Sequence, residues 1–218
     1  MIIVIDGPAG SGKSTTARAV ADKLQVEYLD SGALYRTVTL IYLEAGRDDK
    51  KFFRLLKQKK ISFRYADKQF DVQIDDEWVT DKLRMADVVK YVSEVAAKPQ
   101  VRAYVNELMR TVVCDGIYIA EGRDLGTAVF PDADLKFYMS AQLNERARRR
   151  YEERKAINPD ITLEEVEQNI LQRDRKDSKR KADPLKKADD AVEIDTTNVT
   201  FEQQVEQIAS KVKHLMER

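Results

Sequence analysis

The sequence has few of the residues that often identify a chemistry by themselves, with one cysteine, one histidine and one tryptophan among 218 residues. A single cysteine, Cys114, excludes an intrachain disulfide, and we expect an inert thiol in a reducing compartment. The only histidine, His214, lies far along the chain from every motif described below. We therefore expect it at the surface and expect no histidine general base. We expect Trp78 to anchor the packing of a small sheet.

The chain also lacks net charge and long apolar runs. Its 38 basic residues balance 38 acidic ones, so charge does not favour a long nucleic-acid partner. No apolar run is long enough to cross a membrane, and the N-terminus enters a strand pattern at once, so we expect no signal peptide. These features predict a cytoplasmic protein with no membrane partner. We expect a monomer, because no exposed apolar stripe stands out.

One stretch carries a specific pattern. The string Gly7-Pro8-Ala9-Gly10-Ser11-Gly12-Lys13-Ser14 fits G-x-x-x-x-G-K-[ST] at every fixed position. It follows a β-branched run typical of a buried strand and precedes a helix-forming segment, which is the context that a phosphate loop needs. We expect residues Gly7 to Thr15 to bind the phosphates of ATP. Lys13 would reach the β- and γ-phosphates, and the Ser14 hydroxyl would hold Mg²⁺.

Strand and helix patterns alternate along most of the chain. Strand patterns at residues 2–5, 27–30, 117–120, 135–139 and 191–195 predict an α/β fold of the P-loop NTPase type, with a five-stranded parallel sheet flanked by helices. Residues 61–65 and 70–74 instead alternate apolar and polar side chains, which predicts an antiparallel hairpin, and residues 77–79 are a candidate third strand. We predict a core domain of residues 1–60, 114–147 and 186–218, an inserted domain of residues 61–113 and a lid of residues 148–185.

Basic residues gather on either side of the helix break Asn158-Pro159-Asp160. Residues 141–155 carry a net charge of +3, and residues 173–187 a net charge of +5. Such runs are usually solvated helix faces. In a neutral chain that already has a phosphate loop, we interpret them as an arginine-rich helical lid.

Charged side chains also follow two of the predicted strands. Arg36 lies near the start of a helix that begins after Asp30, where it opposes the helix dipole, so either an anionic partner or a solvent-facing position is expected. Glu121, Arg123 and Asp124 come at the end of another strand, where α/β sheets bind ligands. Glu121 is placed to act on Mg²⁺, directly or through water. The alternative for Arg123 and Asp124 is a surface ion pair.

Five arginines near the predicted motifs provide more positive charge than the phosphates of one ATP with Mg²⁺ require. This surplus suggests a kinase whose acceptor also carries a phosphate. They are Arg36, Arg102, Arg123, Arg173 and Arg180. Another small phosphate-loop kinase, such as a UMP or shikimate kinase, stays open, although the predicted hairpin argues against it. The sequence has no Asn-Lys-x-Asp motif for binding guanine, which argues against a nucleotide-dependent switch. Its zero net charge argues against a nucleic-acid binder.

Strings at residues 30–36, 93–102, 121–127 and 173–180 resemble the bacterial cytidylate kinases, a family of P-loop nucleoside monophosphate kinases. The resemblance covers essentially the whole chain. It implies ATP-dependent phosphorylation of CMP and dCMP to CDP and dCDP, with Mg²⁺. It also implies that the inserted domain binds the monophosphate.

The resemblance further implies roles that spacing alone does not assign. Ser93, Arg102 and Asp124 would contact the cytosine base, Asp177 the sugar hydroxyls, and Ser31 would position the acceptor. Arg36, Arg123 and Arg173 would bind the acceptor phosphate, with Arg180 close by. Lys13, Arg123, Arg173 and Arg180 would form the catalytic set. Asp183 departs from the family pattern, because a neutral residue is expected there.

Overall fold

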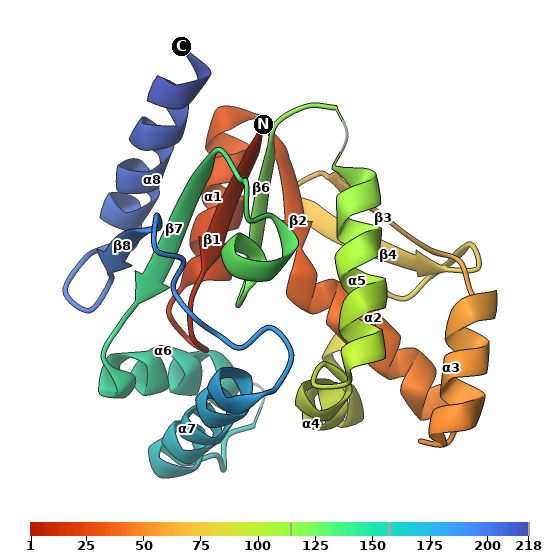
Figure 1. Cartoon of the computed structure of the whole chain (residues 1–218). Coiled ribbons are helices and arrows are strands. Elements are labelled where there is room, and N and C mark those ends of the chain that lie inside the picture. Colours follow the sequence, from red (N-terminus) through yellow and green to blue (C-terminus); the bar gives the residue numbers. More distant parts are fainter. Residues whose placement is uncertain (114, 157, 218) are drawn as a thin grey trace. The chain divides into compact units, whose positions relative to one another are not determined.

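The computed structural model describes residues 1–113, 115–156 and 158–217, and the chain forms two compact units (Figure 1). The first unit consists of Met1–Glu27 and Asp115–Arg218, and the second of Tyr28–Cys114. The interpretation of Cys114 as an inert thiol lies outside the described residues. The division into core, inserted domain and lid stays a prediction.

The first unit is built on parallel strands. Strand β1 (Ile2–Asp6) pairs in parallel with β6 (Tyr118–Gly122) and β7 (Leu135–Ser140), and β7 pairs in parallel with β8 (Val192–Asp195). The complete sheet has the order β2-β6-β1-β7-β8, with β2 at Glu27–Asp30. Ile3, Val4 and Ile5 have no exposed surface, as expected for a strand covered on both faces. The predicted five-stranded parallel sheet is confirmed.

In the described residues this unit contains four α-helices, two of which (the third and the fourth) begin at a capping box. They are α1 (Lys13–Leu24), α6 (Leu143–Lys155), α7 (Leu163–Lys179) and α8 (Phe201–Met216), with a short π-helical turn, η2, at Leu125–Val129. Thr162 and Glu165 form a capping box at the start of α7, in which each side chain accepts from the other residue's backbone N–H. α1 packs against α8, and α6 against α7 (Figure 1).

A small apolar cluster joins α6 and α7 to the phosphate loop. Ala147 of α6 and Val166 and Ile170 of α7 pack with Ala9 of the loop, and all four side chains are buried. Helices α6 and α7 therefore both pack with the loop, although Ala147 lies just before the predicted lid of residues 148–185.

The second unit combines helices with a separate antiparallel sheet. Its elements are α2 (Ser31–Glu44), α3 (Asp49–Gln58), β3 (Ile61–Ala66), β4 (Gln69–Ile74), β5 (Glu77–Trp78), the 3₁₀ turn η1 (Thr80–Arg84), α4 (Ala86–Val95) and α5 (Pro99–Val112). Strand β4 lies between β3 and β5 and buries Phe70, Val72 and Ile74, so one face is covered as the alternation predicted.

Two expectations about single residues have opposite outcomes. His214 is exposed on α8, as predicted. The expectation for Trp78 is wrong: its residue is 45% exposed, and its ring lies under the guanidinium of Arg64 at 4.5 Å. β5 is a two-residue strand at the edge of its sheet, so a side chain as large as an indole has strand neighbours on one side only. Within the described part of the chain, no helix is long and apolar enough to cross a membrane.

Candidate functional site

The phosphate loop keeps its shape because glycines stand where side chains do not fit. A Cβ on Gly7 would lie 2.1 Å from the main-chain oxygen of Met139, which is an impossible contact. Gly12 has φ of 86°, a conformation that other residues rarely adopt. The chain then enters α1 at Lys13, so the positive end of the helix dipole faces the loop.

Lys13 is buried beside a group of charged side chains. Its ammonium donates to the Pro8 carbonyl at 3.2 Å, and the residue is only 4% exposed. Burial lowers the pKa of Lys13, and the charges of Arg123 and Arg173 lower it further, whereas Glu121 and Asp177 raise it. A bound polyphosphate would favour the charged form of this lysine. The structure thus gathers four of the expected residues around one ammonium group.

Ser14, the last residue of the phosphate-loop motif, is hydrogen-bonded to Glu121 at the end of β6. The Ser14 hydroxyl donates to Glu121 Oε1 at 2.8 Å, although the residues are 107 positions apart. A hydroxyl and a carboxylate are hard oxygen donors of the kind that Mg²⁺ prefers, so the pair fits this ion. No cluster of three or more His, Cys, Asp or Glu side chains suited to a metal occurs in the described residues. An ion at Ser14 and Glu121 would therefore need further oxygens from phosphates or water.

Asp177 lies at the centre of the arginines contributed by the first unit. Its carboxylate is 3.2 Å from Arg123 Nε, 3.9 Å from Arg180 Nη1 and 4.0 Å from Arg173 Nε. Arg180 also donates to Asp124 Oδ1 at 2.6 Å, and both of these side chains are almost fully buried. The alternative of a surface ion pair between Arg123 and Asp124 is therefore wrong.

Asp183, the departure from the family pattern, contributes main-chain atoms. Its carbonyl accepts from Arg180 Nε at 2.6 Å, and its φ of 46° lies in the left-handed region. Aspartate tolerates this region better than most residues. The residue therefore supports Arg180 through the backbone.

In the second unit, Arg36 is held by the residue that caps α2. Asp30 caps α2 through Oδ1, which accepts from the Ala33 N–H at 2.8 Å, and its Oδ2 lies 3.2 Å from Arg36 Nη2. The expected anionic partner of Arg36 is thus Asp30. Arg36 Nε is buried and has no hydrogen-bond partner among the described residues. Ser31, the first residue of α2, is buried next to this pair.

Arg102 of the second unit is fixed at the junction of α4 and α5. The residue is 1% exposed, and its Nη1 donates to the Ala96 carbonyl at 3.3 Å. Its guanidinium carbon lies 5.3 Å from the centre of the Tyr35 ring, within the range of a cation–π contact. Ser93 lies half-buried on α4, one turn before that junction. Asp124, the third residue expected at the base, belongs to the first unit.

Several residues that hold the phosphate loop or the turn at Leu125 were not predicted from the sequence. Asp6 accepts from the N–H groups of Leu125 and Gly126, Arg146 and Asp174 contact the main chain of Ala9, and the Thr196 hydroxyl donates to the Ser11 carbonyl. No local signal separates Arg146 from the other arginines of its run. For Asp6, a carboxylate at the end of a β-branched strand pattern was a usable signal.

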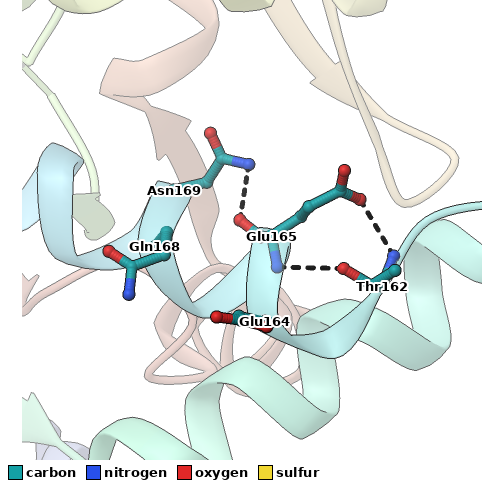
Figure 2. A pocket seen from close by; sticks show the side chains of 5 residues that line it. All are labelled: Thr162, Glu164, Glu165, Gln168 and Asn169. Carbon is teal, nitrogen blue, oxygen red and sulfur yellow. Dashed lines mark hydrogen bonds between the residues drawn. The ribbon is translucent and has the colours of Figure 1, made fainter.

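Two surface clefts differ in how well their lining residues suit a nucleotide. Figure 2 shows one at the start of α7, where Thr162, Glu165 and Asn169 bond to one another and to the helix backbone. Its carboxylates would repel phosphates. The other cleft adjoins the phosphate loop, and its lining includes Gly12, Thr15, Glu145, Arg148, Arg149 and Phe201. Its carboxylate, Glu145, is neutralised by ion pairs with both arginines. No sequence pattern predicted this cleft.

Comparisons with known proteins agree on one family. The family model for cytidylate kinase matches residues 3–214. The cytidylate kinase of Carboxydothermus hydrogenoformans is 42% identical over 208 residues, covering 94% of each chain. That of Clostridioides difficile is 42% identical over 215 residues, covering 97% of this chain and 98% of its own.

Among solved structures, a shikimate kinase from Bacteroides thetaiotaomicron is similar over 100% of this chain and 99% of its own, with a TM-score of 0.50 and 14% identity. At that identity the likeness concerns the fold alone, which is that of a P-loop kinase. The matches to the family model and to the curated relatives extend over nearly the whole sequence, and the chain belongs to the cytidylate kinase family.

Proposed function

We propose that this protein transfers the γ-phosphate of ATP to CMP and dCMP, forming CDP and dCDP. The observation that carries the proposal is the set of charged contacts beside the phosphate loop. Lys13 is buried against the loop, Glu121 accepts from Ser14, and Asp177 lies within 4.0 Å of both Arg123 and Arg173. Phosphoryl transfer depends mainly on positioning and charge neutralisation, which this group supplies. Membership of the cytidylate kinase family supports CMP as the acceptor.

In this proposal the first unit binds ATP. The loop of residues 7–15 holds the polyphosphate through the Lys13 ammonium and through main-chain N–H groups, apart from Pro8, which has none, and Ala9, whose N–H donates to Asp174. The adenosine enters the cleft next to Gly12 and Thr15. The cleft adjoins the end of the loop from which a nucleoside would extend. The planar guanidinium groups of Arg148 and Arg149 line it and suit stacking on a base.

The residues proposed to bind CMP are those that the resemblance to the family implies. The second unit supplies Arg36 for the acceptor phosphate, Ser31 beside it, and Ser93 and Arg102 for the base. The buried and unsatisfied Nε of Arg36 supports this role, because a donor in such a place gains from an anionic ligand. The first unit supplies Arg123, Arg173 and Arg180 for phosphate oxygens, Asp124 for the base and Asp177 for the sugar.

Mg²⁺ completes the proposed site through Ser14 and Glu121, whose oxygens are 2.8 Å apart. When bound, the ion would neutralise part of the charge on the reacting phosphates. The lid of residues 148–185 would keep water from the reaction. A cytoplasmic monomer without a nucleic-acid partner stays a prediction.

The test is a coupled assay with ATP and Mg²⁺ over CMP, dCMP, UMP, AMP, GMP and shikimate. We expect CMP and dCMP to give the highest kcat/KM, and an equal response to all acceptors would overturn the proposal. Lys13→Ala should lower kcat at least about 100-fold, since it removes charge stabilisation at the transferring group.

A matched pair of variants tests the acceptor side. Arg36→Ala should raise the KM for CMP at least about tenfold and leave the KM for ATP within about twofold, because it removes one charged contact. Arg54→Ala, an exposed arginine on α3 of the same unit, is the control and should change neither constant.

A further inference from the structure

The main chain of Ala9, in the middle of the phosphate loop, is held from both sides by an ion pair. The Ala9 N–H donates to Asp174 Oδ1 at 3.1 Å, and Arg146 Nη1 donates to the Ala9 carbonyl at 2.9 Å. Arg146 Nη1 also lies 2.5 Å from Asp174 Oδ2. We call Arg146 and Asp174 the Ala9 clamp.

The clamp is built into the protein interior. The side chains of Arg146 and Asp174 are only 10% and 18% exposed. Arg146 is itself fixed by its Nε, which donates to the Ala141 carbonyl at 3.0 Å at the start of α6. Arg148, Arg149 and Arg150 of the same helix instead pair with glutamates, and the first two line the cleft beside the loop. Arg146 is thus the buried member of the run.

Stability alone gives little reason for such a pair. Desolvating two charges is costly, and apolar residues of similar size often stabilise a fold as well or better. Apolar contacts between the helices and the loop already exist through Ala147, Val166 and Ile170. What apolar side chains cannot do is fix the direction of the N–H and carbonyl groups of Ala9, and the clamp fixes both.

The clamp also connects the loop to the charges next to Lys13. Asp174 lies on α7 between Arg173 and Asp177, the two α7 residues that act on the Lys13 ammonium. The residue that bonds to Ala9 therefore also sets where this part of α7 lies relative to the loop.

We propose that Arg146 and Asp174 are positioning residues that hold the phosphate loop in its ATP-binding conformation and align α7 with it. The inference rests on the proposed function only in taking ATP as the ligand of the loop. A loop that is already ordered does not lose conformational freedom when ATP binds, so removal of the clamp should weaken ATP binding and slow transfer.

The experiment compares Arg146→Ala, Asp174→Ala and the double variant in the full-length protein. It measures the Kd of ATP by calorimetry without an acceptor, kcat with CMP, and Tm. Each single variant should raise the Kd of ATP about tenfold or more and lower kcat, as expected for loss of charged hydrogen bonds. Each should also lower Tm, because one buried charge loses its partner.

The double variant separates positioning from stability. It removes both charges, so its Tm should recover toward that of the wild type. Its ATP Kd and kcat should stay at least as impaired as those of the worse single variant. Recovery of affinity and turnover together with Tm would overturn the proposal, and so would single variants that lose Tm but keep the wild-type Kd and kcat.

Two further variants complete the design. Asp174→Asn keeps an oxygen that can accept from the Ala9 N–H, so its effect on Kd should be smaller than that of Asp174→Ala. Arg150→Ala removes an arginine whose side chain is 41% exposed and pairs with Glu153 on the same helix, and it should leave all three measurements unchanged. Wild-type protein that binds ATP but leaves CMP unphosphorylated would refute the proposed function, whereas the Kd series would still test the clamp.

Discussion

Asp6 offers a direct test of the electrostatics beneath the site. The residue ends β1 just before the phosphate loop and is 4% exposed. Its Oδ1 accepts from the Leu125 N–H at 3.0 Å, and its Oδ2 from the Gly126 N–H at 2.8 Å. It thus anchors the turn that follows Arg123 and Asp124. We consider the substitution Asp6→Asn.

The expected effect depends on pH. Burial raises the pKa of Asp6 from 3.8 to about 7, against the lowering effect of its two N–H partners. Between these values the folded chain holds a proton that the unfolded chain has released. The stability of the folded form therefore falls as the pH rises from about 4 to about 7. Since each pKa unit is worth about 1.4 kcal/mol, the change is at most about 4 kcal/mol.

The amide introduced by Asp6→Asn does not titrate, so the variant lacks this pH dependence. It keeps one acceptor oxygen but turns an NH₂ group toward the other N–H, which costs about 1–3 kcal/mol at every pH. The wild type should therefore be more stable than Asp6→Asn at pH 4.5. The difference should shrink as the pH rises and should vanish or reverse by pH 8.

The assay is urea unfolding of both proteins at pH 4.5, 6 and 8 and constant ionic strength. Asp190→Asn is the control: the hydrogen bond from Lys136 holds the pKa of Asp190 below its usual range, so its contribution is lost only in more acidic solution. Its stability difference from the wild type should stay constant over these pH values. A difference between Asp6→Asn and the wild type that is equally constant would refute the reasoning.

Three other substitutions test single features of the site. Glu121→Gln should raise the Mg²⁺ concentration for half-maximal activity about tenfold, because the neutral amide is a weaker ligand than the carboxylate that now accepts from Ser14. A Mg²⁺ titration of the initial rate measures this. Gly32→Ala places a Cβ 3.1 Å from both Arg36 Nη1 and Asp30 Oδ1, so steady-state kinetics should show a raised KM for CMP and an unchanged KM for ATP. Gly7→Ala would force a contact of 2.1 Å with a carbonyl, and calorimetry should show a Tm lowered by about 5 °C or more and a loss of ATP binding. A normal ATP Kd in the last variant, or unchanged constants in the first two, would contradict these expectations.

The sequence by itself determined the features that arise from local rules. The phosphate loop was predictable because its glycines, its lysine and the strand and helix around it lie within one short segment. The hairpin of residues 61–74 and the capping box at Thr162 follow from alternation and from a four-residue pattern. The residues proposed to bind CMP came from strings that resemble a family, and their roles stay predictions.

Only the tertiary structure decided which charged residues become buried partners. Ser14 meets Glu121 across 107 positions, and Ala9 meets Asp174 across 165. Arg146 and Arg150 stand one helical turn apart in the same charged run, yet one is buried against the loop and the other faces solvent. Burial depends on which face of α6 packs on α7 and Ala9, and apolar residues distant in the sequence set that packing. The sequence of a short charged segment does not specify those distant neighbours. It could therefore predict a basic lid, but not that Arg146 holds the loop.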